Sequence, residues 1–194
     1  MKKLLYAAFA LVLLAGLFLA APQITARAID PEAQDDPNKV ALGKAMFFDA
    51  NLSANGTQSC ATCHAAAVGF TGPDATVNAG GAVYQGALPN RFGNRKPPAS
   101  AYAGDSPKLF YDDIDGGWFG GMFWDGRATG EVLGDPLAEQ AQGPFLNPKE
   151  QAISSANEVV AKVQASTYSY LFARQCPGTD TTELYNCIGR AIAA

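Results

Sequence analysis

The segment Cys60-Ala61-Thr62-Cys63-His64 constrains this chain more than any other feature of its sequence. It places two thiols three residues apart, with an imidazole directly after the second thiol. On one helical turn, both sulfurs can form thioether bonds to the two vinyl groups of a porphyrin, and His64 then points at the iron. His64 is also the only histidine in the chain. The sequence therefore predicts one covalently bound haem c, attached through Cys60 and Cys63, with His64 as its metal ligand.

A zinc site and a thioredoxin-type redox pair are the alternative interpretations of the two cysteines. Zinc needs a second pair of ligands, but Cys176 and Cys187 lie more than a hundred residues away and have no adjacent histidine. A thioredoxin-type pair expects a βαβ pattern, which the sequence does not show. Because Cys176 and Cys187 close a short loop, we expect them to form a structural disulfide in an oxidising compartment.

The opposite side of the iron has few candidate ligands. With no second histidine, the sixth position takes water, a methionine or a group from another chain. Met46 fits the apolar face of a predicted helix and is expected in the core, which leaves Met122 as the candidate thioether ligand of the iron. For Met122 we nevertheless favour packing over ligation. An open position would admit peroxide, whereas Met122 ligation would suit plain electron transfer.

Residues 1–28 have the pattern of a secretory signal peptide. Met1-Lys2-Lys3 precedes an apolar stretch over residues 4–21, and Ala26-Arg27-Ala28 resembles a signal peptidase site. An uncleaved membrane anchor is the alternative, because ~18 apolar residues lie near the lower limit for a membrane span. In both cases we expect residues 29–194 to lie outside the cytoplasm, in the periplasm.

Composition excludes some classes of protein. Hydrophobic residues make up 48% of the chain and charged residues 16%, which is typical of a globular domain and not of a disordered one. Removal of residues 1–28 would leave 14 − 3 = 11 basic residues against 18 acidic ones, a net charge of −7. We therefore expect no nucleic-acid partner; the acidic surface either serves solubility or steers a basic electron carrier.

Helical patterns separated by long loops predict a mainly α fold. The segment over residues 69–121 is rich in Gly, Pro, Asn and Asp without a sustained period, and we expect it to wrap as loops around the one covalently bound haem. No alternating run is long enough to predict a sheet. We expect residues 29–194 to form one c-type cytochrome domain. The helical patterns cover residues 36–47, 135–142, 155–165 and 180–194.

Several blocks around the haem motif resemble the bacterial di-haem cytochrome c peroxidase and MauG family, specifically its N-terminal, peroxidatic haem domain. The resemblance spans roughly residue 40 to the C-terminus and is far more specific than the haem motif alone. The blocks are Leu42-Gly43-Lys44-Ala45-Met46-Phe47-Phe48-Asp49, Leu52-Ser53, Gly56-Thr57-Gln58-Ser59, Asn94-Arg95-Lys96-Pro97-Pro98, Phe123-Trp124-Asp125-Gly126-Arg127-Ala128 and Glu139-Gln140-Ala141-Gln142-Gly143-Pro144-Phe145-Leu146-Asn147-Pro148-Lys149-Glu150.

The resemblance implies roles for individual residues. Glu150 would be the distal acid-base carboxylate and Gln140 would orient peroxide. Phe123 would line the distal pocket, and Trp124 would lie on the electron path between haems. A carboxylate can relay the proton that O–O cleavage requires; the alternatives are an exposed helix-start carboxylate for Glu150 and a solvated amide for Gln140. Arg127 would bind either a haem propionate or Asp125.

The sequence also departs from the family. A second Cys-x-x-Cys-His motif is missing, so we expect the chain to end before the family's second haem domain. Lys96 stands where the family often has an Asn that contributes to a calcium site, and an ammonium cannot ligate calcium, which argues against calcium here. The resemblance implies a periplasmic peroxidase that reduces hydrogen peroxide with electrons from a small cytochrome c or cupredoxin, with a second haem-bearing chain as a further partner. The alternatives are a single-haem electron carrier and a truncated, inactive fragment.

Overall fold

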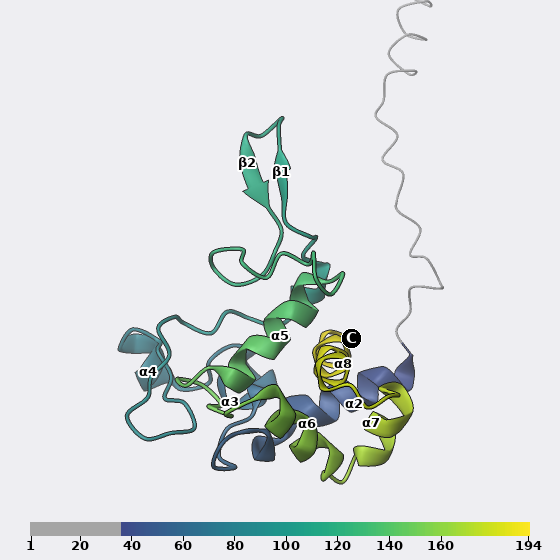
Figure 1. Ribbon diagram of the computed structural model, residues 1–194. Coiled ribbons are helices and arrows are strands. Elements are labelled where there is room, and N and C mark those ends of the chain that lie inside the picture. Colours follow the sequence, from purple (N-terminus) through teal and green to yellow (C-terminus); the bar gives the residue numbers. More distant parts are fainter. Residues whose placement is uncertain (1–35) are drawn as a thin grey trace, which may run out of the picture. The chain divides into compact units, whose positions relative to one another are not determined.

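The computed structural model describes residues 36–194, so the predicted signal peptide lies outside the described residues. Within this part of the chain, no helix is long and apolar enough to cross a membrane. The α-helices are α2 (Pro37–Phe48), α3 (Cys60–Cys63), α4 (Ala75–Ala79), α5 (Pro136–Leu146), α6 (Ala156–Gln164), α7 (Ser169–Gln175) and α8 (Thr181–Ala193). Short 3-10 turns cover Ala50–Leu52, Ala66–Val68 and Ala103–Asp105, and the two strands are β1 (Phe110–Asp112) and β2 (Gly117–Phe119). Figure 1 shows how these elements follow one another.

The long helices begin where the sequence predicts them. Asp36, Asp135, Ser155 and Asp180 each accept a hydrogen bond from a backbone N–H of the first turn of α2, α5, α6 and α8 respectively. These side chains satisfy N–H groups that have no partner within the helix. In α2 and α5 a proline follows the cap, where its missing N–H costs nothing. The prediction of a mainly α fold is confirmed, while the wrapping of loops around haem stays a prediction.

The expectation that the chain contains no sheet is wrong. β1 and β2 pair as an antiparallel hairpin in which Phe110 faces Phe119 and Tyr111 faces Trp118. The hairpin lies within the segment predicted as loop and projects away from the helices (Figure 1). Helix α7 was likewise not predicted.

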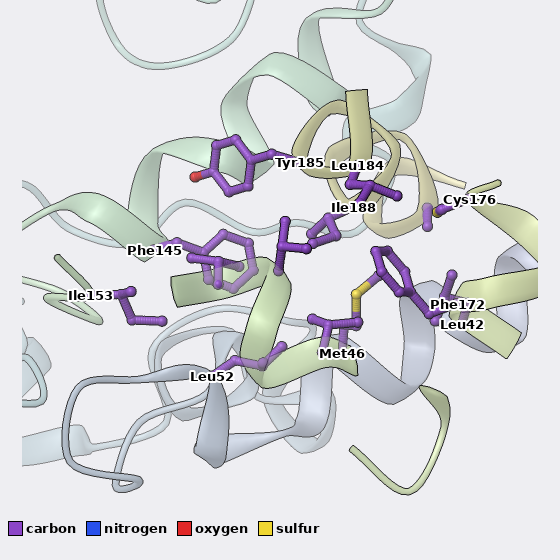
Figure 2. Packing of buried hydrophobic residues seen from close by; sticks show 14 residues of the cluster. Leu42, Met46, Leu52, Phe145, Ile153, Phe172, Cys176, Leu184, Tyr185 and Ile188 are labelled. Carbon is purple, nitrogen blue, oxygen red and sulfur yellow. The ribbon is translucent and has the colours of Figure 1, made fainter. Parts of the chain in front are cut away.

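The core lies between α2, α5, α6, α7 and α8, and Figure 2 shows its side chains. Met46 and Leu42 of α2, Phe145 of α5 and Ile188 of α8 are fully buried. Each large apolar side chain buried in this way contributes about 1.5–3 kcal/mol relative to an exposed one. The prediction that Met46 is a core residue is confirmed.

Two glycines let α8 approach its neighbours closely. A Cβ on Gly43 of α2 would overlap the backbone carbonyl of Ala191, and a Cβ on Gly189 would lie 2.6 Å from the carbonyl oxygen of Ala138 in α5. Since a carbonyl of a packed helix cannot move aside freely, both positions require the absence of a side chain. The two contacts set the depth at which α8 packs between α2 and α5.

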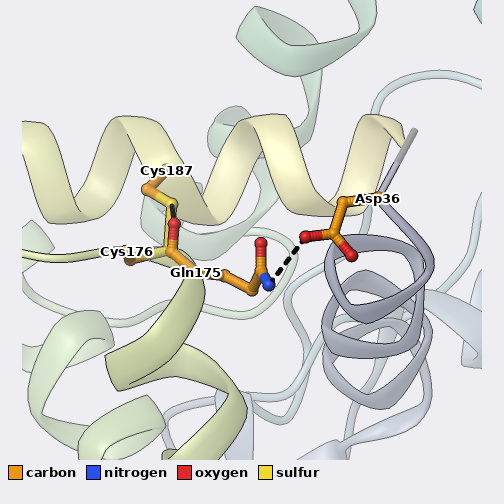
Figure 3. The surroundings of a disulfide bond; sticks show 4 residues. All are labelled: Asp36, Gln175, Cys176 and Cys187. Carbon is orange, nitrogen blue, oxygen red and sulfur yellow. Dashed lines mark hydrogen bonds between the residues drawn. A yellow bond between two sulfur atoms is a disulfide. The ribbon is translucent and has the colours of Figure 1, made fainter. Parts of the chain in front are cut away.

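The predicted disulfide between Cys176 and Cys187 is confirmed, with a Cα–Cα distance of 5.7 Å. It joins the end of α7 to the middle of α8 (Figure 3). The side-chain amide of Gln175, next to Cys176, donates to Asp36 Oδ2 at 3.0 Å. The C-terminal helices are thereby attached to each other and to the N-terminus of α2.

Candidate haem site and its surroundings

The two cysteines of the haem motif lie on the single turn of α3, as the motif predicts. Their thiols are free and do not form a disulfide with each other. The turn is held at its start because Ser59 N–H donates to Thr62 Oγ1 at 3.0 Å. Burial raises the pKa of the Cys60 thiol to about 12, and it also raises the pKa of Cys63. Both residues are therefore present as neutral thiols on one turn, which is the arrangement that attachment to two vinyl groups needs.

The ring of His64 is oriented by the backbone that follows it. His64 Nδ1 lies 3.2 Å from the carbonyl oxygen of Phe70, and a carbonyl can only accept, so Nδ1 carries the proton. This leaves Nε2 unprotonated and able to bind a metal. Burial lowers the pKa of His64, which favours the neutral, ligating form over the contrary effect of backbone groups at Phe70 and Pro98.

Two buried glutamine side chains have unpaired polar atoms, Gln58 beside the haem motif and Gln151 directly after Glu150. Gln58 Nε2 lies 3.6 Å from Cys63 Sγ, while Gln58 Oε1 has no hydrogen-bond partner. Gln151 is 2% exposed, and neither its Oε1 nor its Nε2 has a partner. A buried polar group without a partner is costly, so the unpaired Gln58 Oε1 beside Cys63 is compatible with a further group at the motif. Free thiols on one turn, an oriented imidazole and this unpaired amide oxygen together fit a covalently attached haem.

Glu150 lies in the turn after α5 and is half-buried, so the alternative of an exposed helix-start carboxylate is wrong. Its Oε1 accepts from Asn147 Nδ2 at 3.0 Å, and its own carbonyl accepts from Ala87 N–H at 2.8 Å. Burial raises the pKa of Glu150, against the opposite effects of the Asn147 amide and the Arg127 guanidinium. The carboxylate is close enough to the haem motif to contribute to the raised pKa of Cys60 and Cys63.

Gln140 lies on the face of α5 that points away from the core. Residues 138, 141 and 145 form the buried face, whereas Gln140, Gly143 and Asn147 recur at the i, i+3, i+7 spacing of the opposite face. Gln140 is half-buried there, and the structure gives its side chain no hydrogen bond. Asn147, at the end of this face, donates to Glu150, so both residues for which the resemblance implies a distal role lie at or next to this face.

The segment over residues 121–128 forms a tight turn beside α5. Met122 and Ala128 form an antiparallel bridge, and Met122 is half-buried, so the structure leaves its predicted choice between packing and ligation open. The ring of Phe123 contacts Gly143, where an added Cβ would lie 2.9 Å from Cζ. Trp124 is 89% exposed. Phe123 therefore lies against the face of α5 that carries Gln140 and Gly143, which we call the site face, whereas Trp124 points to solvent.

Arg127 has two partners in this turn. Its guanidinium lies 3.6 Å above the centroid of the Phe123 ring, and its Nη1 lies 2.8 Å from Asp125 Oδ1. Of the two partners predicted for Arg127, Asp125 is the one that the structure shows. The guanidinium thus stacks on the Phe123 ring and also places a positive charge near Glu150.

Glu139 has a structural role that the sequence analysis did not assign. Its carboxylate accepts backbone N–H groups from Gly130 at 2.9 Å, Val132 at 2.7 Å and Leu133 at 3.0 Å. The carboxylate thus anchors the end of the segment that carries Phe123 to the helix that carries Gln140. Glu139 follows the cap of α5 by four residues, a position typical of acidic residues in a first turn, and this was its only signal.

The structure thus brings Glu150, Phe123, Arg127 and the haem-motif cysteines into one neighbourhood, with Gln140 on the adjoining helix face. Trp124 is not packed against any of them. Asn147 and Gln58, which contact Glu150 and Cys63, were recognised only as parts of longer blocks. Asn147 did carry a signal, because it precedes Glu150 by three residues in a turn.

Comparisons with known proteins point to one family. The profile of the family described as di-haem cytochrome c peroxidase matches residues 37–194. The methylamine utilization protein MauG of Paracoccus denitrificans is 43% identical over 129 residues, which are 66% of this chain and 31% of that protein. Cytochrome c peroxidase Ccp of Escherichia coli is 37% identical over 130 residues, 66% of this chain and 22% of that protein.

A solved structure shows the same arrangement of elements. The crystal structure of the diheme peroxidase BthA from Burkholderia thailandensis aligns with a TM-score of 0.72 and 32% sequence identity. The alignment covers 82% of this chain and 38% of the diheme peroxidase. This chain therefore spans between about a fifth and two fifths of the length of these relatives.

Proposed function

Because the chain belongs to the di-haem cytochrome c peroxidase family, we propose that it is a haem c peroxidase that reduces hydrogen peroxide with electrons from a small redox protein. A bound haem would supply the redox-active iron at which the O–O bond is reduced. The observation that carries the proposal is the half-buried Glu150 carboxylate beside the haem-motif cysteines. Peroxide reduction consumes two electrons and two protons and yields two molecules of water, so each turnover requires two one-electron donors.

The residues of the site would have separate roles in binding haem and in handling peroxide. Cys60 and Cys63 would hold the haem, and His64 would offer Nε2 to the iron. Glu150 would relay a proton between the two oxygens of peroxide, and burial raises the pKa of this carboxyl above that of an exposed one. Gln140 would donate a hydrogen bond to peroxide without changing its own charge.

The environment of the site supports this assignment. The ring of Phe123 lies against Gly143, and the guanidinium of Arg127 stacks on that ring and lies near Glu150. The Glu150 carboxylate is itself half-buried, and partial removal from bulk water favours proton transfer to a bound substrate. We further propose that the chain is exported to the periplasm, which agrees with the disulfide between Cys176 and Cys187.

The optical spectrum of the purified haem-loaded ferric protein, recorded before and after one equivalent of hydrogen peroxide, tests the proposal. A high-spin spectrum that changes stoichiometrically with peroxide supports an open sixth position and the peroxidase function. A low-spin spectrum that does not respond to peroxide refutes it and favours a single-haem electron carrier with Met122 as the sixth ligand. The same sample gives the haem content per chain by pyridine haemochrome assay.

Glu150→Gln separates the proton relay from haem binding. Glutamine keeps the oxygen that accepts from Asn147 but cannot relay a proton. We expect the haem content to remain at the level of the unaltered protein, and the rate of the reaction with peroxide to fall by about 10²-fold to 10⁴-fold. Glu131→Gln, at an exposed position, is the matched control and should leave the rate unchanged. Equal rates for the two variants would remove Glu150 from the mechanism.

A further inference from the structure

The hairpin of β1 and β2 carries exposed aromatic side chains on both faces. Phe110 and Phe119 stack on one face with ring centroids 6.0 Å apart, and Tyr111 and Trp118 pack edge to face on the other at 5.5 Å. Trp118 remains 68% exposed. None of the four rings belongs to the hydrophobic core. Isolated two-stranded hairpins are only marginally stable in water. Exposed apolar patches of this kind are typical of protein interaction sites, so the hairpin is suited to binding a partner.

The tip of the hairpin is acidic and apolar at once. Asp113 and Asp115 are exposed, and Ile114 between them is 94% exposed. Asp112 shapes the turn, since its Oδ1 accepts from the N–H groups of Ile114 and Asp115. Over residues 105–119 there are four Asp and one Lys, so the net charge is 1 − 4 = −3. Among the described residues, no Lys or Arg forms an ion pair with these carboxylates.

The base of the hairpin is bonded to the turn that carries Trp124. Gly121 N–H donates to the carbonyl of Pro107 at 2.8 Å, and Leu109 N–H donates to the carbonyl of Thr129 at 2.9 Å. The exposed Trp124 thus belongs to the same structural unit as the hairpin. A protein bound to the hairpin would therefore lie next to residues 121–128, the segment that carries Phe123.

We propose that the hairpin over residues 110–119 is the docking surface for the electron donor, a small redox protein with basic side chains around an apolar centre. The proposal rests on the proposed function. Aromatic anchors of this kind supply most of the binding energy at protein interfaces, while surrounding charges steer the approach. The carboxylates of Asp113 and Asp115 select a basic partner, and the rings of Trp118 and Tyr111 pack against its apolar centre.

Charge separates this occupant from a second copy of the chain. Two hairpins brought together would oppose the carboxylates of one tip to those of the other, and like charges in an interface are costly. A basic donor is instead attracted by these carboxylates, and the attraction is stronger at low ionic strength, where charges are screened less.

The dissociation constant for a basic mitochondrial-type cytochrome c, used as the probe, tests the proposal. Isothermal titration calorimetry is run with the haem-loaded ferric protein and the oxidised probe, without peroxide, at low and high salt. We expect Trp118→Ser to weaken binding by tenfold or more. The double variant Asp113→Lys with Asp115→Lys should weaken binding to a similar degree at low salt and reduce its salt dependence. Tyr170→Ser, which removes an aromatic ring that is 70% exposed on α7, is the matched control and should bind like the unaltered protein.

Three results would overturn the proposal. The first is equal affinity for the hairpin variants and Tyr170→Ser. The second is the absence of measurable binding by the unaltered protein. The third is sedimentation of the unaltered protein as a dimer that Trp118→Ser converts to a monomer, which would assign the hairpin to self-association. Since the titration contains no peroxide and the peroxidase test contains no donor, failure of docking and failure of the proposed function are seen separately.

Discussion

Replacement of Glu139 by glutamine tests how the site segment is attached to α5. In the structure, Oε1 accepts the N–H groups of Val132 and Leu133, and Oε2 accepts that of Gly130. Glutamine retains one acceptor oxygen, so its amide nitrogen faces an N–H group that it cannot accept. The variant loses at least one charge-assisted hydrogen bond and weakens two more. At about 1.5–3 kcal/mol for a bond to a charged group, we expect a loss of about 2–3 kcal/mol in the free energy of unfolding.

The loss should depend on pH in a defined direction. Burial alone would raise the pKa of Glu139, but the N–H groups of Leu133, Gly130 and Val132 outweigh burial and lower it. A carboxyl with a lowered pKa stabilises the folded state above its unfolded-state value, and the contribution is lost as pH falls through the folded-state value. The difference between the unaltered protein and Glu139→Gln should therefore be full near neutral pH and shrink towards pH 3.

Urea denaturation of the haem-loaded protein, followed by circular dichroism at both pH values, measures the difference. Glu131→Gln is the control, because the structure gives this exposed side chain no hydrogen bond. A loss below about 0.5 kcal/mol at neutral pH would refute the argument, since that is the range of ordinary surface substitutions. A loss of equal size at both pH values would show that shape, and not the charge of Glu139, holds the segment.

Two further predictions concern the packing of α8. Gly43→Ala should lower the free energy of unfolding by about 1–3 kcal/mol, because the new Cβ meets the carbonyl of Ala191. Thermal unfolding measures this loss. Gly104→Ala is the control and should change stability little, because the space around Gly104 is open. Replacement of Cys176 and Cys187 by serine should cost about 3 kcal/mol, as expected for opening a short loop. An unchanged unfolding midpoint of that double variant in urea would contradict the view that the disulfide staples α7 to α8.

The sequence predicted the four longest helices of the described residues, each of which has a locally encoded start. An Asp or Ser lies directly before α2, α5, α6 and α8, and its side chain caps the helix in the structure. Asp74 caps the short helix α4 in the same way, yet α4 lies in the segment predicted as loop. Helix α7 has no side-chain cap, so no local residue indicated where it begins. The end of α5 was missed by four residues because the sequence pattern stopped at Gln142, whereas the helix tolerates Pro144 in its last turn.

The hairpin escaped prediction for a physical reason. A strand is recognised by alternation when one face is buried and the other is wet. Phe110 and Tyr111 point to opposite faces, yet both are aromatic and both are exposed, as are their partners Trp118 and Phe119. Because neither face of the hairpin is buried against the rest of the chain, its strands show no alternation of apolar and polar residues. The Asp-Gly-Gly sequence over residues 115–117, between two aromatic pairs, was the available signal.

The haem motif could be read from five residues, but the surroundings of Glu150 could not. Its burial depends on Ala87, whose N–H donates to the Glu150 carbonyl, and on Gly86, where an added Cβ would overlap the Lys149 carbonyl. These contacts join segments more than sixty residues apart, so no local pattern reports them. The resemblance to a family identified the residue, and the structure supplied the reason for its raised pKa.

The position of Glu150 follows from the same packing that forms the core. Ile153 N–H donates to the carbonyl of Phe145 at 2.8 Å, and Gln151 N–H donates to that of Pro144 at 3.1 Å, so the chain turns back along the end of α5. Because Phe145 is fully buried, the turn that presents Glu150 is fixed by the core. The hairpin has no such attachment, since its aromatic rings lie outside the core. Substitutions at its tip should therefore change partner binding without moving the acid, which makes docking and chemistry experimentally separable in this chain.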